Sequence, residues 1–199
     1  MFEIVKNFET AIAHFYGAPY AVATDSCTHA IELSLRFNQV SMATCPAHTY
    51  ISIPFTLQKL NITWQFEELA WSDYYRLGHT NVIDAAVYWK KDGYIPDSLM
   101  CLSFQFQKHL NLIRGGAVLT DNYVAYLALK KMSYDGRLPE SPWKTQDIDV
   151  MGYHYYMPPE TAQMGLDKLP EAMDSTPRVW TWQDYPHLPK MAVFNSLRN

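Results

Sequence analysis

Apolar residues along the chain recur first at helical and then at strand spacing. Phe8, Ile12 and Phe15 lie three or four residues apart and Gly17 follows them, which predicts an amphipathic helix over residues 7–16. Short continuous apolar runs predict buried strands. On this basis we expect strands at 20–24, 42–45, 62–66, 81–88, 100–102 and 117–119, a helix beginning near residue 30, and helices at 51–60, 123–132 and 160–169. This alternation predicts an α/β fold with a mostly parallel sheet, whose ligands bind beyond the carboxyl ends of the strands.

The chain of 199 residues is long enough for one large core. We expect an α/β domain over residues 1–170, with a long excursion at 133–150. The segment 171–199 has little periodicity, but its aromatic residues need a surface to cover. We therefore expect it to be a tail that packs on the core or on a dimer partner.

Composition and charge exclude several classes of partner. The net charge is −4 and no block of lysine or arginine occurs, so neither nucleic acid nor an anionic membrane surface is expected as a partner. The three cysteines form no CxxC pair, which favours a reducing compartment. The N-terminus lacks the features of a signal peptide and no run has the length of a membrane span. We expect a soluble cytoplasmic protein.

Lys108 is the only charged residue between Asp97 and Arg114, on a loop between two expected core strands. A lysine beside aromatic and amide side chains on such a loop could be a desolvated amine of lowered pKa, able to form a Schiff base with a carbonyl. The alternative is a solvated surface lysine, which is the commoner case.

Two further positions could bind ligand groups. Ser26, Cys27 and Thr28 join a strand to a helix N-terminus, which could hold a phosphate, although serine and threonine are also ordinary helix N-caps. Asp84 places a carboxylate in an otherwise apolar strand, either as a cap or turn residue or as the partner of a cationic ligand group.

Together with the aromatic Tyr50, these residues are the parts that a pyridoxal phosphate site needs. A lysine carries the aldehyde, an aspartate keeps the pyridine nitrogen protonated, an aromatic ring stacks on the cofactor, and a helix N-terminus takes the phosphate. No metal site is expected.

At this point the sequence resembles the DegT/DnrJ/EryC1/StrS family of sugar aminotransferases. The resemblance covers roughly residues 7 to 170, and its most specific parts surround Asp84 and Lys108. The matching segments are Phe8-Glu9, Tyr20-Ala21-Val22, Ser26-Cys27-Thr28, Pro46-Ala47-His48-Thr49-Tyr50, Asp84-Ala85-Ala86, Ser103 to Lys108, Gly115-Gly116-Ala117 and Gly152 to Met157.

The resemblance implies the fold of aspartate aminotransferase, fold type I, with the C-terminal domain largely missing. It implies that Lys108 forms the Schiff base with pyridoxal phosphate and that Asp84 binds the pyridine nitrogen. It also implies that Tyr50 stacks on the ring and that Ser103, with the 26–28 turn, binds the phosphate. The segment containing His154 would reach across a homodimer interface into the neighbour's site.

The activity implied is transfer of an amino group, from glutamate as the expected donor, to a keto group of a nucleotide-linked sugar. Dehydratase relatives have histidine at the position of Lys108, so the lysine favours an aminotransferase. The sequence departs from the family pattern by having Cys27 for glycine, Arg114 for glutamate, His154 for asparagine and Tyr156 for arginine. The alternative is a catalytically silent short member that serves as a binding or assembly module.

Overall fold

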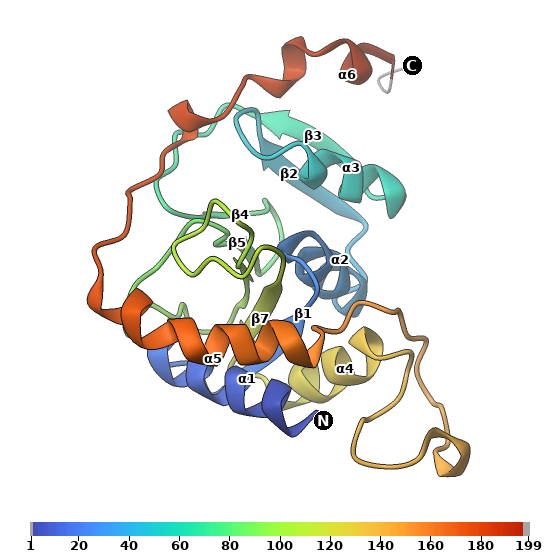
Figure 1. The fold of residues 1–199 in the computed structure, drawn as a ribbon. Helices are drawn as coiled ribbons and strands as arrows, with labels where there is room; N and C mark the ends of the chain where they lie inside the picture. Colours follow the sequence, from blue (N-terminus) through green and yellow to red (C-terminus); the bar gives the residue numbers. More distant parts are fainter. Residues whose placement is uncertain (1, 197–199) are drawn as a thin grey trace.

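The computed structural model describes residues 2–196 (Figure 1). Its strands are β1 (Tyr20–Thr24), β2 (Met42–Pro46), β3 (Thr63–Glu67), β4 (Tyr75–Arg76), β5 (Val82–Asp84), β6 (Leu99–Ser103) and β7 (Gly116–Thr120). Its α-helices are α1 (Glu3–Tyr16), α2 (Cys27–Phe37), α3 (Ser52–Lys59), α4 (Tyr123–Ser133), α5 (Pro159–Asp174) and α6 (Ala192–Ser196). Short 3-10 turns are η1 (Trp143–Thr145), η2 (Trp182–Asp184) and η3 (Leu188–Lys190). Among the helices of this described part, none combines the length and apolarity needed to cross a membrane.

The α/β class is confirmed, but the main sheet is mixed where we expected a mostly parallel one. It has five strands in the order β1-β7-β6-β5-β4, and β5 and β6 are its parallel pair. The chain passes from β6 to β7 through the loop 104–115 without a crossover helix, so β7 returns antiparallel to β6. Strands β2 and β3 form a separate parallel pair, and a bridge between Thr44 and Gly78 connects that pair to the segment after β4.

Alternation of side chains along the strands produces a core on each face of the main sheet. Ala21, Ala23, Met100 and Leu102 point into the core shared with α1 and α5, whereas Val22, Leu99 and Cys101 point into the core shared with α2 and α4. Figure 1 shows α5 lying along α1 on the first face. The sheet is therefore a buried layer that fixes the positions of the strand ends.

Three elements differ from the predictions. Helix α1 begins at Glu3 rather than at residue 7, because Val5 continues its buried stripe. Helix α5 continues past the expected end at residue 169 and through Pro170, since Leu169 and Ala172 are both buried. Strand β5 ends at Asp84 instead of continuing to residue 88, because the Asp84 carboxylate accepts a hydrogen bond from the backbone N–H of Ala86. That bond closes a turn directly after the strand.

The segment after α5 crosses the molecule and lies beside the β2–β3 pair (Figure 1). Backbone hydrogen bonds join it to the body of the protein. The N–H of Asp73 donates to the carbonyl of Trp180 at 2.8 Å, that of Trp182 donates to Trp71 at 3.1 Å, and that of Leu188 donates to Ala47 at 2.8 Å. We call residues 178–190 the strap. The proposed division of the chain at residue 170 stays a prediction.

Candidate active site

A cavity of about 300 Å³ lies at one edge of the main sheet. Strands β1, β6 and β5 run in the same direction, because β1 and β6 are each antiparallel to β7, and β5 is parallel to β6. Their carboxyl ends therefore meet at this edge and deliver the turn after β1, Ser103 and Asp84 to one place. The predicted residues that line the cavity are Ser26, Cys27, Thr28, Tyr50, Asp84, Ser103 and Lys108.

Asp84 is a buried carboxylate at the inner wall of the cavity. One carboxylate oxygen accepts the Ala86 N–H at 3.0 Å, and the other accepts the hydroxyl of Tyr75 at 2.5 Å. Burial raises the pKa of Asp84, while the bond from Tyr75, the bond from Ala86 and the charge of Lys108 oppose the rise. Among the described residues, Asp84 forms no salt bridge, and it lines the cavity.

Lys108 lies on the loop between β6 and β7, which is tied down by backbone bonds. The Leu112 N–H donates to the Phe104 carbonyl at 2.8 Å, and the Lys108 N–H donates to that of Gln105 at 2.8 Å. Burial lowers the pKa of the Lys108 amine, although the charge of Asp84 opposes this. The amine lies 5.2 Å from the centre of the Trp180 ring, in the geometry of a cation–π contact. Lys108 is thus a partly desolvated amine and not a solvated surface lysine.

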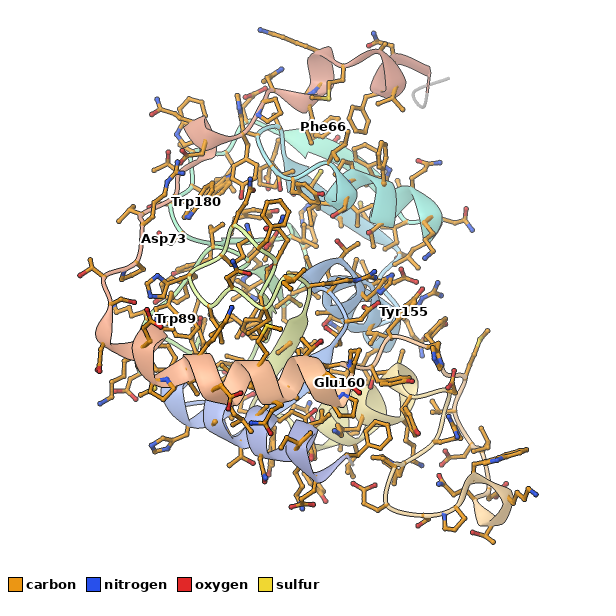
Figure 2. The ribbon with its side chains drawn as sticks, viewed as in Figure 1. Phe66, Asp73, Trp89, Tyr155, Glu160 and Trp180 are labelled. Atoms are coloured by element: carbon orange, nitrogen blue, oxygen red, sulfur yellow. The ribbon has the colours of Figure 1, made fainter. Side chains whose placement is uncertain are left out.

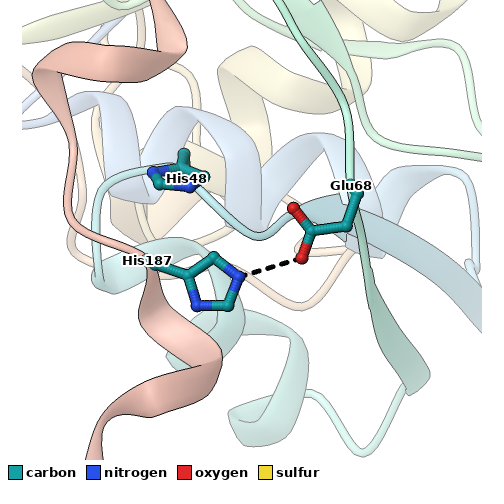
Figure 3. A group of neighbouring side chains, drawn as sticks. All are labelled: His48, Glu68 and His187. Atoms are coloured by element: carbon teal, nitrogen blue, oxygen red, sulfur yellow. Dashed lines mark hydrogen bonds and ion pairs between the residues drawn. The ribbon is translucent and has the colours of Figure 1, made fainter.

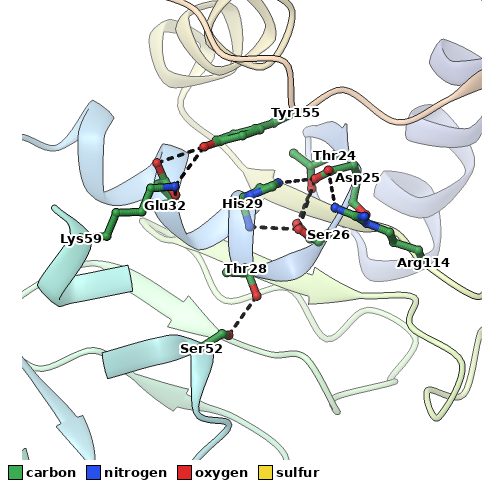
Figure 4. Close-up of polar contacts among 10 residues, drawn as sticks. All are labelled: Thr24, Asp25, Ser26, Thr28, His29, Glu32, Ser52, Lys59, Arg114 and Tyr155. Carbon is green, nitrogen blue, oxygen red and sulfur yellow. Dashed lines mark hydrogen bonds and ion pairs between the residues drawn. The ribbon is translucent and has the colours of Figure 1, made fainter. Parts of the chain in front are cut away.

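The turn at residues 26–28 begins α2 (Figure 4), and its residues line the cavity. The Ser26 hydroxyl accepts the His29 N–H at 3.3 Å, so Ser26 is an N-cap, as the alternative had it. The backbone N–H groups of Cys27 and Thr28 precede the first intrahelical donors and have no acceptor within the helix. The capping and anion-binding interpretations are therefore compatible. Burial raises the pKa of the Cys27 thiol well above its usual range, so it stays neutral beside these amides.

Gly116 is required by the close approach of β7 to this turn. A Cβ atom at Gly116 would lie 2.4 Å from the carbonyl carbon of Ser26 and 2.5 Å from the nitrogen of Cys27. Any other residue would therefore push the turn away from the sheet. The glycine therefore allows the turn with the Cys27 and Thr28 amides to lie against β7, where it lines the cavity.

Charges around the turn are paired (Figure 4). Arg114, which also lines the cavity, donates to the Asp25 carboxylate at 2.8 Å, and the ring of His29 bonds the same carboxylate at 2.6 Å. The carboxylate of Asp25 is thus compensated by a cation, and an anion at the 26–28 turn would not face an uncompensated charge of its own sign.

Sequence reasoning missed several residues of the cavity. Tyr75 comes from the two-residue strand β4, which is too short to produce a period, and its hydroxyl joins Asp84 to Thr49. The strap contributes Trp180, Asp184 and Tyr185 to the lining. Figure 2 shows Trp180 lying beside Asp73. The high aromatic content of the tail was the available signal, but it did not indicate which surface the rings cover.

A second cavity adjoins the first at Lys108. Ser103, Lys108 and Trp180 line both cavities, and Arg178 lines the second. The Arg178 guanidinium stacks 3.9 Å from the centre of the Trp180 ring and forms an ion pair with Asp184. The indole of Trp180 therefore lies in contact with both cations at the junction of the two cavities.

His154 lies apart from this cavity. Its ring bonds the Asp135 carboxylate at 2.9 Å, its side chain is largely exposed, and its backbone forms a bridge with Tyr134. We expected it to act in a neighbour's site, so its role in a dimer stays a prediction.

The side chains and amides that line the cavity have the chemistry to bind pyridoxal phosphate. Within residues 2–196, the cavity offers a buried carboxylate without a salt-bridge partner, an amine of lowered pKa and a helix N-terminus with free amides. These match the pyridine nitrogen, the aldehyde and the phosphate respectively. The donor set fits the cofactor, and the fold is that of the pyridoxal-phosphate-dependent aminotransferase class.

Comparison with known proteins agrees with this class. The sequence model of the DegT/DnrJ/EryC1/StrS aminotransferase family matches residues 1–75 and 84–178, and the chain belongs to that family. Comparison with curated protein sequences gives no match.

Three solved structures illustrate the shared fold. A Bacillus cereus protein described as a PLP-dependent aminotransferase superposes with a TM-score of 0.72 at 15% identity, over 86% of this chain and 59% of its own. Spr1654 of Streptococcus pneumoniae, described as a sugar aminotransferase and solved in its PLP form, gives 0.70 at 18% identity, over 85% and 59%. DesI, solved with its TDP-sugar product, gives 0.67 at 21% identity, over 85% and 54%. The chain thus spans little more than half the length of these proteins, and the expected cofactor agrees with the class to which they belong.

Proposed function

We propose that this chain is a pyridoxal-phosphate-dependent aminotransferase that moves an amino group from glutamate to a keto group of a nucleotide-linked sugar. The observation that carries the proposal is the convergence of Lys108, Asp84 and the 26–28 turn on one cavity. Family membership supports the reaction class. The sugar and the donor rest on the family alone.

Pyridoxal phosphate, when bound, supplies an aldehyde that forms a Schiff base with an amine and a protonated ring that withdraws electrons from the substrate. Asp84 would hold the proton of the pyridine nitrogen, and Ser26, Cys27, Thr28 and Ser103 would hold the phosphate. Tyr50, whose side chain is exposed at the cavity, would cover one face of the ring.

Lys108 would act as the general base and acid. A buried amine of lowered pKa releases a proton more readily near neutral pH than an ordinary lysine, so it can take a proton from one carbon and return it to another. The charge of Asp84 limits how far that pKa falls. Trp180 covers the amine and reduces its contact with water.

Substrates would reach Lys108 through the second cavity. Arg178 is the cation of this cavity besides Lys108, and its guanidinium could bind a carboxylate of the amino donor by exchanging partners from Asp184. This role requires the strap to remain in place.

A homodimer with shared sites is part of the proposal, since the family segment at 152–157 carries His154 away from its own cavity. The free, buried cysteines support the expected cytoplasmic location, because thiols persist in a reducing compartment. Light scattering at micromolar concentration should give twice the monomer mass. A monomer that retains the cofactor would contradict the proposal that two chains share each site.

The function is tested by mixing the purified full chain with pyridoxal phosphate and following visible absorbance. Binding through an amine should produce a new visible band, and added glutamate should then convert it to the spectrum of the aminated cofactor. Lys90→Ala changes an exposed lysine outside both cavities and should behave like the wild type.

A visible band that does not respond to any amino donor would contradict the aminotransferase and leave the silent binding module. No band at all would contradict the cofactor site. In the described part of the chain, no observation favours the silent module at present.

A further inference from the structure

A group of potential metal ligands lies outside both cavities (Figure 3). His48, Glu68 and His187 each offer one ligand atom, and these atoms lie within 4.8 Å of one another. Two imidazoles and one carboxylate are a ligand set that zinc takes in proteins, with a fourth position for water. The three residues come from the loop after β2, the segment after β3 and the strap, so their separation in sequence gave no spacing motif.

The orientation of His48 suits metal binding. Its Nδ1 lies 2.8 Å from the carbonyl oxygen of Tyr185 and can donate to it, which leaves Nε2 unprotonated and available to bind an ion. A metal-bound histidine in proteins almost always donates its other ring N–H to such an acceptor. The carbonyl of Tyr185 thus fixes both the tautomer and the ring position.

Only one of the two ring nitrogens of His187 has a hydrogen-bond partner among the described residues. Its Nε2 lies 2.9 Å from a carboxylate oxygen of Glu68, whereas its Nδ1 is buried and has no hydrogen-bond partner among the described residues. Glu68 is largely exposed at 75% of its side-chain surface, so the carboxylate can turn without disturbing the core. The proton shared by His187 and Glu68 occupies a position that a cation can take.

The backbone around the three ligands is held in place without a metal. The Ala47 N–H donates to the Glu67 carbonyl at 2.8 Å, and the Leu188 N–H donates to the Ala47 carbonyl at 2.8 Å. His48 and His187 also form a backbone bridge. These bonds join the residues next to each ligand, so little ordering would be needed on binding.

We propose that His48, Glu68 and His187 bind one divalent transition-metal ion, with Zn²⁺ as the representative ion. Binding replaces the hydrogen bond between His187 and Glu68: the ion takes the lone pair of Nε2, and the single proton of the neutral imidazole moves to Nδ1. The ion links the strap to the loop after β2 and to the segment after β3. It therefore stabilises the segment that carries Trp180 and Tyr185 into the candidate active site.

The site is tested by calorimetric titration of the full, chelator-treated chain with Zn²⁺. We expect one ion per chain. His187→Ala and Glu68→Gln should each weaken binding at least about tenfold, since even the loss of a residue bonded to a ligand costs that much. His14→Ala, which removes an exposed histidine of α1, is the matched control and should bind like the wild type.

Glu68→Gln keeps the shape of an exposed side chain, so it remains informative if His187→Ala fails to fold. Hydrogen exchange provides a second measurement: Zn²⁺ should slow exchange at Leu188 in the wild type and not in Glu68→Gln. Equal zinc binding by the wild type and both ligand variants, or no binding by the wild type, would overturn the proposal. Neither measurement depends on pyridoxal phosphate or on catalysis.

Discussion

Two buried carboxylates of this protein have opposite surroundings. Glu9 of α1 is bonded by the Lys130 amine through both oxygens, at 2.9 and 2.8 Å, and by the Ala23 N–H at 2.8 Å. Asp84 of β5 is bonded by a tyrosine hydroxyl and one backbone N–H, and Lys108, whose charge acts on it, lines the same cavity without forming a salt bridge. Burial raises the pKa of both carboxylates.

The difference separates a structural ion pair from a pair of groups suited to hold a ligand. The bonds of Glu9 join α1, β1 and α4, and nothing remains for a ligand to complete. Asp84 and Lys108 are both desolvated but are kept from pairing, so each loses hydration without gaining the full attraction of the other. A bound group with a cationic nitrogen at one end and a reactive carbonyl at the other would give Asp84 a cationic partner and Lys108 a carbonyl to react with.

The largest effect on stability is expected from breaking the structural pair. Lys130→Ala leaves the Glu9 carboxylate buried without its cation and should lower the free energy of unfolding by about 3–5 kcal/mol. Lys108→Ala should change it by less than about 1 kcal/mol, because the removed amine is itself desolvated. Urea unfolding of the cofactor-free proteins measures both, and an equal loss in the two variants would contradict the comparison.

Tyr75→Phe should have an intermediate effect. The variant removes the hydroxyl that donates to the Asp84 carboxylate, and a hydrogen bond to a charged group contributes about 1.5–3 kcal/mol. Tyr16→Phe is the matched control, since this buried tyrosine donates to the neutral carbonyl of Tyr88 and should lose only about 0.5–1.5 kcal/mol.

A double-mutant cycle with Asp84→Asn identifies the partner of Tyr75. The loss caused by Tyr75→Phe should shrink when residue 84 is neutral. The same loss in both backgrounds would show that Tyr75 acts through packing.

Asp84→Asn should change stability less than Tyr75→Phe does, and the change should be a gain. Burial raises the pKa of Asp84 in the folded state, so between the usual aspartate value of 3.8 and the raised value the folded protein binds more protons than the unfolded chain. Stability of the wild type therefore falls as pH rises through this window. The asparagine variant avoids the loss, so its gain of about 0.5–2 kcal/mol should be present at neutral pH and vanish as pH falls to 3.8.

Thermal unfolding of the wild type and the asparagine variant at several pH values measures this gain in stability. Turnover by the same variant should drop severely, because an amide cannot keep the pyridine nitrogen protonated. A variant that is less stable at neutral pH and fully active would show that Asp84 is a structural residue.

The sequence allowed prediction of those elements that carry local periodicity. The strands at β1, β2, β6 and β7 and the helix α4 lie within a residue or two of their expected bounds, because continuous apolar runs and helical spacing are local signals. The mixed direction of the sheet was not predictable in this way, since it depends on which connections lack a helix.

For the site, residues whose chemistry is unusual for their local context could be found from the sequence. Asp84 in an apolar strand and Lys108 as an isolated charge are such residues, and both lie at the cavity. Tyr75 could not be found, because its strand β4 has only two residues and produces no period. Trp180 and His187 could not be found, because the strap lies against segments more than a hundred positions earlier.

The central claim is that Lys108 is the amine that reacts with the cofactor. The full chain is incubated with pyridoxal phosphate, reduced with borohydride and digested with trypsin. A reduced pyridoxyl group on Lys108 blocks cleavage there, so the account predicts one labelled peptide covering residues 92–114. Lys130, held by Glu9, and Lys131, held by Asp149, should remain unlabelled. Label on another lysine, or full amino transfer by Lys108→Ala, would contradict the account.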